Sequence, residues 1–167
     1  MRKMTNKVSG FTLVELIVVI LLISIISAYA ASRYLGKDSL SAYVAQEQAI
    51  SIIRQIQVNR MQSNLSSLAE NGHYRLMVSQ SCLGSVAACQ LSADQDTRRS
   101  DVLRGENLTF SLSPSLSNET VFFDLLGNPV SESNQPLGDV IITITSPSSR
   151  AGVCINAQGY IAKQGEC

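Results

Sequence analysis

The apolar run between Leu16 and Ser32 limits most strongly what this chain can become. It contains no charged residue and is dominated by Leu, Ile and Val. Counted from Phe11 to Ala31, the segment has 21 residues, and a helix of that length reaches roughly 32 Å, enough to cross the hydrocarbon core of a bilayer. Glu15 lies near its start. An ionisable side chain inside a membrane helix is costly, so Glu15 requires a functional explanation.

The residues before the run predict its orientation. Met1 to Gly10 carries Arg2, Lys3 and Lys7 and no acidic residue. Because basic flanks stay on the cytoplasmic side, we expect the N-terminus inside and the bulk of the chain outside. A secretory signal peptide has a similar layout, but this run is long for one and no clean small-residue cleavage site follows it. A plain signal anchor also fits, and hydropathy alone does not separate it from other anchored proteins.

The basic leader ends at Gly10, and Phe11-Thr12-Leu13-Val14-Glu15 and the apolar run follow. This combination resembles the N-terminus of type IV prepilins and of type II secretion pseudopilins. The resemblance covers roughly the first third of the chain. It implies that a membrane prepilin peptidase cuts between Gly10 and Phe11, and that the new amine of Phe11 is methylated.

The chemistry of Glu15 agrees with that resemblance. After cleavage, the cationic amine of Phe11 lies one helical turn from Glu15. In a filament, Glu15 of one subunit can pair with the Phe11 amine of its neighbour, and breaking a buried pair costs about 3–5 kcal/mol. The resemblance implies other pilin subunits, the prepilin peptidase and an inner-membrane pilus assembly platform as partners. It also implies a single pass through a bacterial inner membrane, a periplasmic head and later residence in a pilus.

The four cysteines predict disulfides. On the expected topology they lie in an oxidising compartment, and four cysteines allow three connectivities. We expect the local pairing, Cys82 with Cys89 and Cys154 with Cys167. A zinc site ranks well below disulfides because the spacings contain no C-x2-C pair.

Helical periodicity continues beyond the apolar run. Apolar residues recur at spacings of three and four, with three more widening the stripe; these are Ala42, Ala45, Ala49, Ile52 and Ile56, then Tyr43, Ile50 and Ile53. We predict one long helix from about Thr12 to about Ser63. Its weak point is Gly36-Lys37-Asp38-Ser39, because Gly is conformationally permissive and Asp and Ser favour helix starts.

After Asn71-Gly72 the period changes to two, which predicts about six strands. They fall near residues 74–78, 108–112, 121–125, 140–145, 151–156 and 160–162. The stretch from Ser79 to Asp101 is polar, rich in small residues and holds the first cysteine pair. The fold class is therefore α+β and type IV pilin-like, with one long N-terminal helix packed on an antiparallel β domain. The expected divisions are a leader (1–10), a membrane or filament-core helix (11–33), the outer half of the helix (34–65) and a β-rich head (66–167).

Enzyme chemistry finds little support in the sequence. His73 is the single histidine and precedes a strand, and no G-x-S-x-G or HExxH motif occurs. The aspartates near Arg98, Arg99 and Arg104 predict a mixed-charge loop, with calcium a minor alternative; they are Asp94, Asp96 and Asp101. We expect no enzyme, no cofactor and no metal.

The C-terminal block adds a second, less specific resemblance. Phe122-Phe123-Asp124, Gly127, the strand at 140–145 and Arg150 to Ile161 are similar to FimT-like minor pilins and H-type pseudopilins, and MSHA-type minor pilins share this general composition. The expected function is a minor type IV pilin, structural or assembly-initiating. The alternatives are a DNA- or surface-binding pilin and a type II secretion minor pseudopilin. DNA binding is disfavoured, because the mature chain has ten basic against thirteen acidic residues.

Overall fold

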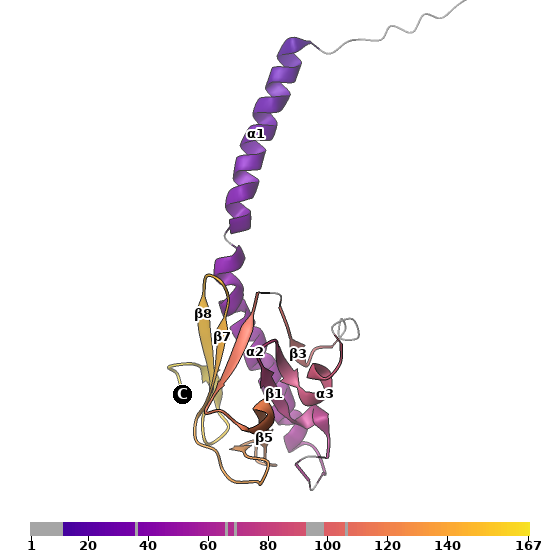
Figure 1. The fold of residues 1–167 in the computed structure, drawn as a ribbon, viewed down its shortest axis with the longest axis vertical. Coiled ribbons are helices and arrows are strands. Elements are labelled where there is room, and N and C mark those ends of the chain that lie inside the picture. Colours follow the sequence, from indigo (N-terminus) through magenta and orange to yellow (C-terminus); the bar gives the residue numbers. More distant parts are fainter. Residues whose placement is uncertain (1–11, 36, 66, 69, 93–98, 106) are drawn as a thin grey trace, which may run out of the picture. The chain divides into compact units, whose positions relative to one another are not determined.

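The computed structural model describes residues 12–35, 37–65, 67–68, 70–92, 99–105 and 107–167 (Figure 1). The chain divides into two compact units, Met1–Lys37 and Asp38–Cys167. The second unit is called the head. Gly10 and Phe11 lie outside the described residues.

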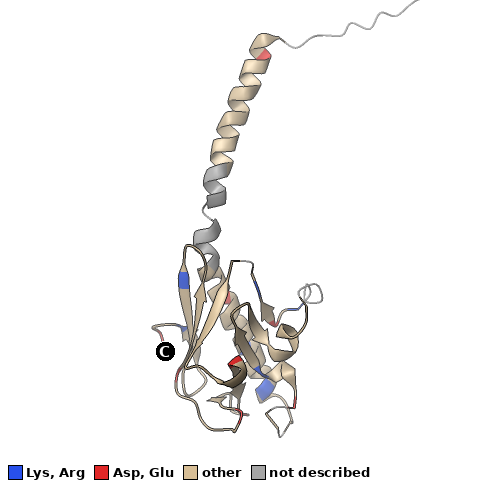
Figure 2. Cartoon of the chain, in the orientation of Figure 1, with Lys and Arg blue, Asp and Glu red and all other residues tan. Residues whose placement is uncertain are grey.

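The first unit contains helix α1, Leu13–Leu35. Most of its side chains are the branched aliphatics Leu, Ile and Val, and the acidic residue of its first turn is Glu15 (Figure 2). The described large apolar side chains from Leu13 to Tyr29 are 41% or more exposed within the chain. This helix therefore buries almost none of its apolar surface against its own protein.

The head is built on helix α2, Lys37–Met61. Its buried face follows the predicted stripe, with Ala42, Ala49, Ile53 and Ile56 all at 0% exposure. Tyr43 was predicted to widen this stripe, and that is wrong, because it is 54% exposed. The alanines keep the buried side of the first half of α2 small, so the sheet can approach closely.

The single helix predicted from Thr12 to Ser63 is described as two helices. α1 ends at Leu35 and α2 begins at Lys37. Gly36, the centre of the predicted weak point, lies outside the described residues.

The first sheet of the head has five strands in the order β3-β2-β1-β5-β6. Their bounds are β1 Leu76–Ser79, β2 Cys82–Ser85, β3 Val102–Leu103, β5 Thr120–Phe123 and β6 Pro129–Val130. A 3-10 turn, η1 (Gly72–Tyr74), precedes β1, a second, η3 (Ser117–Glu119), precedes β5, and a one-turn helix, α3 (Val86–Cys89), follows β2. Every described pairing in the sheet is antiparallel.

The second sheet has four antiparallel strands in the order β4-β7-β8-β9. They are β4 Thr109–Ser113, β7 Val140–Thr145, β8 Arg150–Ile155 and β9 Ile161–Lys163. In β7 the residues Val140, Ile142 and Ile144 are fully buried and alternate with more exposed ones. This alternation places one face of the sheet in the common core with α2.

The α+β prediction is confirmed, and the strands read from alternation are found within a few residues of their predicted bounds. No strand was predicted in the stretch from Ser79 to Asp101. It contains β2 and α3, and β3 begins directly after it at Val102. β2 is buried at all four positions, so it shows no alternation that a sequence pattern could reveal.

Candidate functional site

The start of α1 is a capped helix terminus. The Thr12 side-chain oxygen Oγ1 accepts a hydrogen bond from the Glu15 backbone N–H at 3.2 Å. Thr at the cap with Glu three residues later is the capping-box pattern, in which the two residues satisfy free N–H groups of the first turn. Glu15 thus has a fixed backbone position one turn from the predicted cleavage point.

The apolar surface of α1 must be covered by something outside its own chain. Within the described residues one helix is long and apolar enough to cross a membrane, over Leu13–Ala30, with mean hydropathy 2.6 and none of that window buried. Apolar surface of this extent is unfavourable in water. Lipid or the equivalent helices of neighbouring subunits can cover it, so the helix and its motif are consistent with membrane anchoring.

Both disulfides lie in the head. Cys82 is bonded to Cys89, with their Cα atoms 5.9 Å apart, and Cys154 to Cys167, with Cα atoms 6.2 Å apart. All four cysteines of the chain are therefore used. The first bond clamps α3 onto β2, and the second fastens the C-terminus to β8.

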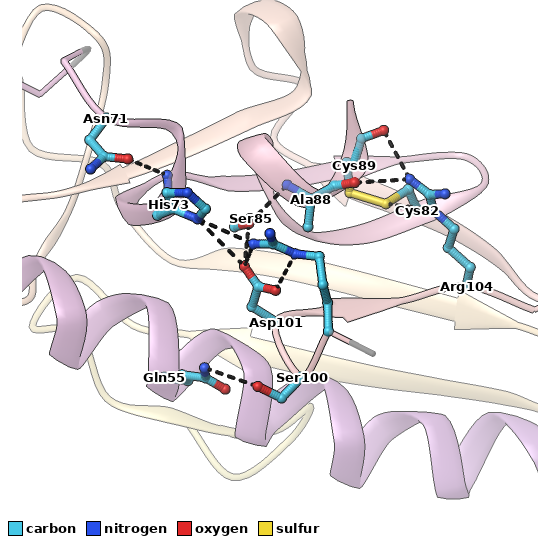
Figure 3. Close-up of polar contacts among 11 residues, drawn as sticks. Gln55, Asn71, His73, Cys82, Ser85, Ala88, Cys89, Ser100, Asp101 and Arg104 are labelled. Atoms are coloured by element: carbon cyan, nitrogen blue, oxygen red, sulfur yellow. Dashed lines mark hydrogen bonds and ion pairs between the residues drawn. A yellow bond between two sulfur atoms is a disulfide. The ribbon is translucent and has the colours of Figure 1, made fainter. Parts of the chain in front are cut away.

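Arg104 holds the end of α3 (Figure 3). Its Nη2 donates to the carbonyl oxygens of Ala88, Cys89 and Leu91 at 3.0–3.1 Å, and its Nε contacts Cys82 Sγ at 3.4 Å. These carbonyls lie in and just after the last turn of α3, where Ala88 O also accepts from Leu91 N, and a cation at this end complements the helix dipole. Arg104 therefore serves the local structure around the disulfide.

A second polar cluster joins η1, β2 and the segment before β3. Asp101 accepts from Arg99 Nη2 and from Ser85 Oγ, both at 2.6 Å, and His73 Nδ1 lies 3.9 Å from the same carboxylate (Figure 3). Partial burial raises the pKa of Asp101, but the hydrogen bonds from Arg99 and Ser85 and the Arg99 charge outweigh it, so the pKa lies below its ordinary value.

Ser85 in this cluster acts as a helix cap. Its Oγ accepts from Ala88 N at 3.1 Å while donating to Asp101, and the residue is fully buried. The Ser, His and Asp side chains are close, but Ser85 bonds to the carboxylate and to a backbone amide instead of to His73. Its contacts are those of a structural residue.

Of the predicted charged loop, Asp94, Asp96 and Arg98 lie outside the described residues, and Arg99 and Asp101 are paired as above. Among the residues that the structure describes, no group of three or more His, Cys, Asp or Glu is arranged to hold a metal ion.

Polar side chains on α2 form a set of contacts that the sequence interpretation missed. Gln57 Nε2 donates to the carbonyls of Gly127 at 2.8 Å and Gly159 at 2.7 Å. Gln46 Nε2 donates to Gly152 O at 2.6 Å, and Arg54 Nη2 donates to Ile161 O at 2.8 Å. These side chains fasten two turns and the strands β8 and β9 of the head to α2.

Arg60, in the last turn of α2, is the deepest of these polar residues at 4% exposure. Its Nε donates to Phe123 O at 3.1 Å, and Nη1 donates to Ser63 Oγ and Leu65 O. A sequence signal existed, because Arg60 follows Ile53 by seven residues and Ile56 by four and so falls on the buried stripe.

The comparison with family models gives one match, the prokaryotic N-terminal methylation motif, over residues 5–31. No curated protein and no solved structure matches the chain. The matched range contains Gly10, Phe11 and Glu15 and most of α1. The match supports a type IV pilin-like, prepilin-type protein.

Proposed function

We propose that this chain is a minor subunit of a type IV pilus, inserted in the inner membrane and polymerised through its N-terminal helix. A prepilin peptidase removes residues 1–10 and Phe11 becomes the N-methylated first residue. The N-terminus starts in the cytoplasm and the head faces the periplasm. The assembly platform and other pilin subunits are its partners. The head contributes to the surface or the tip of the filament.

One observation carries this proposal. Glu15 lies in the first turn of α1, within the matched motif, on a helix that buries none of its spanning window in its own chain. A carboxylate in apolar surroundings needs a positive partner. The amine of Phe11 on a neighbouring subunit supplies that charge and so fixes how far one helix is displaced along the next.

The test compares Glu15→Ala with Glu119→Ala, which removes an exposed carboxylate from the head. Both variants are expected at normal levels in the membrane. In filaments sheared from cells, Glu15→Ala falls at least tenfold, because it leaves the neighbour's amine unpaired, whereas Glu119→Ala stays near the wild-type level. Normal amounts of Glu15→Ala in sheared filaments contradict the proposal.

Processing is checked separately by mass spectrometry of the membrane protein. The expected mature chain begins with N-methylated Phe11. An intact residue 1–10 segment in the assembled protein rules out this route.

A type II secretion minor pseudopilin uses the same N-terminal chemistry, and the filament in which the chain is found distinguishes the two. A DNA-binding head receives less support, since the described arginines of the predicted basic cluster, Arg99 and Arg104, already have intramolecular partners. Phosphate binding depends on accessible cations.

A further inference from the structure

A groove of about 600 Å³ lies at the C-terminal end of α2, beside the end of β5. It is called the α2-end groove here. Its walls include Arg60, Leu68, Leu125, Leu126 and Glu132. It lies outside the N-terminal assembly motif and serves none of the contacts described for that motif.

Arg60 is a buried cation without a described counter-ion. Two of its three guanidinium nitrogens donate to carbonyl and hydroxyl oxygens, all neutral acceptors. Among the described residues, no carboxylate forms an ion pair with Arg60 and no acceptor bonds to its Nη2. Among the described residues, Arg75 Nε is the only fully buried side-chain nitrogen or oxygen without a hydrogen-bond partner. The unbonded Arg60 Nη2 is therefore not fully buried. Nη2 is therefore open to the groove that Arg60 lines.

Asp124, an acidic residue that lines the groove, does not fill this role. Asp124 Oδ1 accepts from Leu126 N and Asn128 N, and its Oδ2 accepts from Asn128 Nδ2, all at 2.8 Å. Its charge is thus directed into its own turn. Glu132 is exposed at the rim of the groove. The positive charge of Arg60 is buried, whereas the carboxylate of Glu132 is exposed.

The same turn presents two leucines to solvent. Leu125 is 51% exposed and Leu126 is 77% exposed. The hydrogen bonds from Leu126 N and Asn128 N to Asp124 hold the turn that carries them. Met61 is 44% exposed and is adjacent, since its sulfur would lie 2.9 Å from a side chain placed at Gly127. Arginine is enriched among the residues that dominate binding energy in protein interfaces, and the exposed apolar side chains beside Arg60 offer surface that a partner can bury.

We propose that the α2-end groove docks another subunit of the same filament, through a loop that carries an acidic residue next to an apolar one. The carboxylate bonds to Arg60 Nη2, the apolar side chain packs on Leu125 and Leu126, and a basic residue of the loop meets Glu132. A small anion would leave the projecting leucines uncovered, so a protein partner fits the surface better. The identity of the partner as a filament subunit rests on the function proposed above.

The test places a photo-reactive amino acid at Ser133, an exposed residue of the groove, in the full chain in its native membrane. Three variants are compared with this parent. Arg60→Gln removes the charge, Leu126→Ser removes the most exposed leucine, and Thr145→Ser is a matched control on an exposed position of β7. Because Arg60 also supports the fold, Leu126→Ser keeps the test decisive if Arg60→Gln does not accumulate.

The expected result is an adduct with another pilin-type subunit whose cross-linked peptide contains Asp or Glu. The adduct falls about tenfold or more in Leu126→Ser and Arg60→Gln, as expected for the loss of one charge-assisted hydrogen bond or one buried leucine, and stays unchanged in Thr145→Ser. An adduct of equal yield in all variants, or one with a peptide lacking a carboxylate, overturns the docking proposal. If the parent is present in sheared filaments but gives no such adduct, docking fails while the filament function stands; absence from filaments refutes the function itself.

Discussion

Gln57 offers the sharpest test of how the head is held together. Its side-chain amide donates to Gly127 O and Gly159 O, two turns that are 32 residues apart in the chain. Both glycines have positive φ, 88° and 79°, which favours glycine. A side chain at Gly159 would collide with the Gly127 carbonyl. The two turns are therefore in contact, and one amide group bonds to both.

The Gln57→Met substitution removes both hydrogen bonds with little change in volume. A typical intramolecular hydrogen bond stabilises a protein by about 0.5–1.5 kcal/mol, so the loss of two predicts a decrease of about 2 kcal/mol in the free energy of unfolding. The head unit runs from Asp38 to Cys167. For a unit of that size the unfolding entropy is about 270 cal/mol/K, so the melting temperature falls by about 7 °C.

The measurement is thermal unfolding of the full chain in detergent, followed by near-ultraviolet circular dichroism. Gln48→Met is the matched control, because Gln48 is exposed on the same helix, and it should change the unfolding free energy by less than about 0.5 kcal/mol. If Gln57→Met melts within 2 °C of Gln48→Met, the two bonds do not stabilise the head as argued.

Two further predictions concern the disulfides and the Asp101 cluster. Replacing Cys154 and Cys167 by Ser lowers the free energy of unfolding by about 3 kcal/mol, and replacing Cys82 and Cys89 lowers it by about 2.5 kcal/mol. The Cys154–Cys167 bond has the larger effect because it closes the longer loop. Urea unfolding measures both effects, and equal stability with and without the bonds contradicts the estimate. The pKa of Asp101 is lowered in the fold from about 3.8, so its contribution is present above that pH and is lost as the pH falls through the lower folded value. Urea midpoints from pH 5 to pH 2 should therefore fall more steeply for the wild type than for Asp101→Asn, and parallel curves refute this.

The sequence predicted the elements whose side chains repeat with a clear period. The apolar stripe of α2 has helical spacing and is buried, and β7 alternates as a half-buried strand does. β2 has no such signal, since all four residues from Cys82 to Ser85 are buried and no alternation of buried and exposed positions occurs. β3 and β6 have two residues each, too few to form a pattern.

The functional residues also differ in whether a local sequence pattern marks them. Glu15 is identified by its place in a motif, which is local in sequence. Arg60 and Gln57 act on carbonyls at Phe123, Gly127 and Gly159, and no local pattern names an acceptor that distant. Tyr43 shows the opposite error, since it neighbours Ala42 in sequence but lies about 100° around the helix, on the solvent side.

The polar contacts of α2 have a consequence for the order in which the protein can be made. Gln46, Arg54 and Gln57 donate to carbonyls at Gly152, Ile161 and Gly159, each more than 100 residues later in the chain. Such distant pairings form only after the intervening chain has been synthesised. In the topology proposed above, α2 would leave the membrane first and wait until residues through Ile161 have crossed. A chain that stops short of that point would leave the apolar face of α2 uncovered and open to proteases, so export itself would separate complete chains from truncated ones.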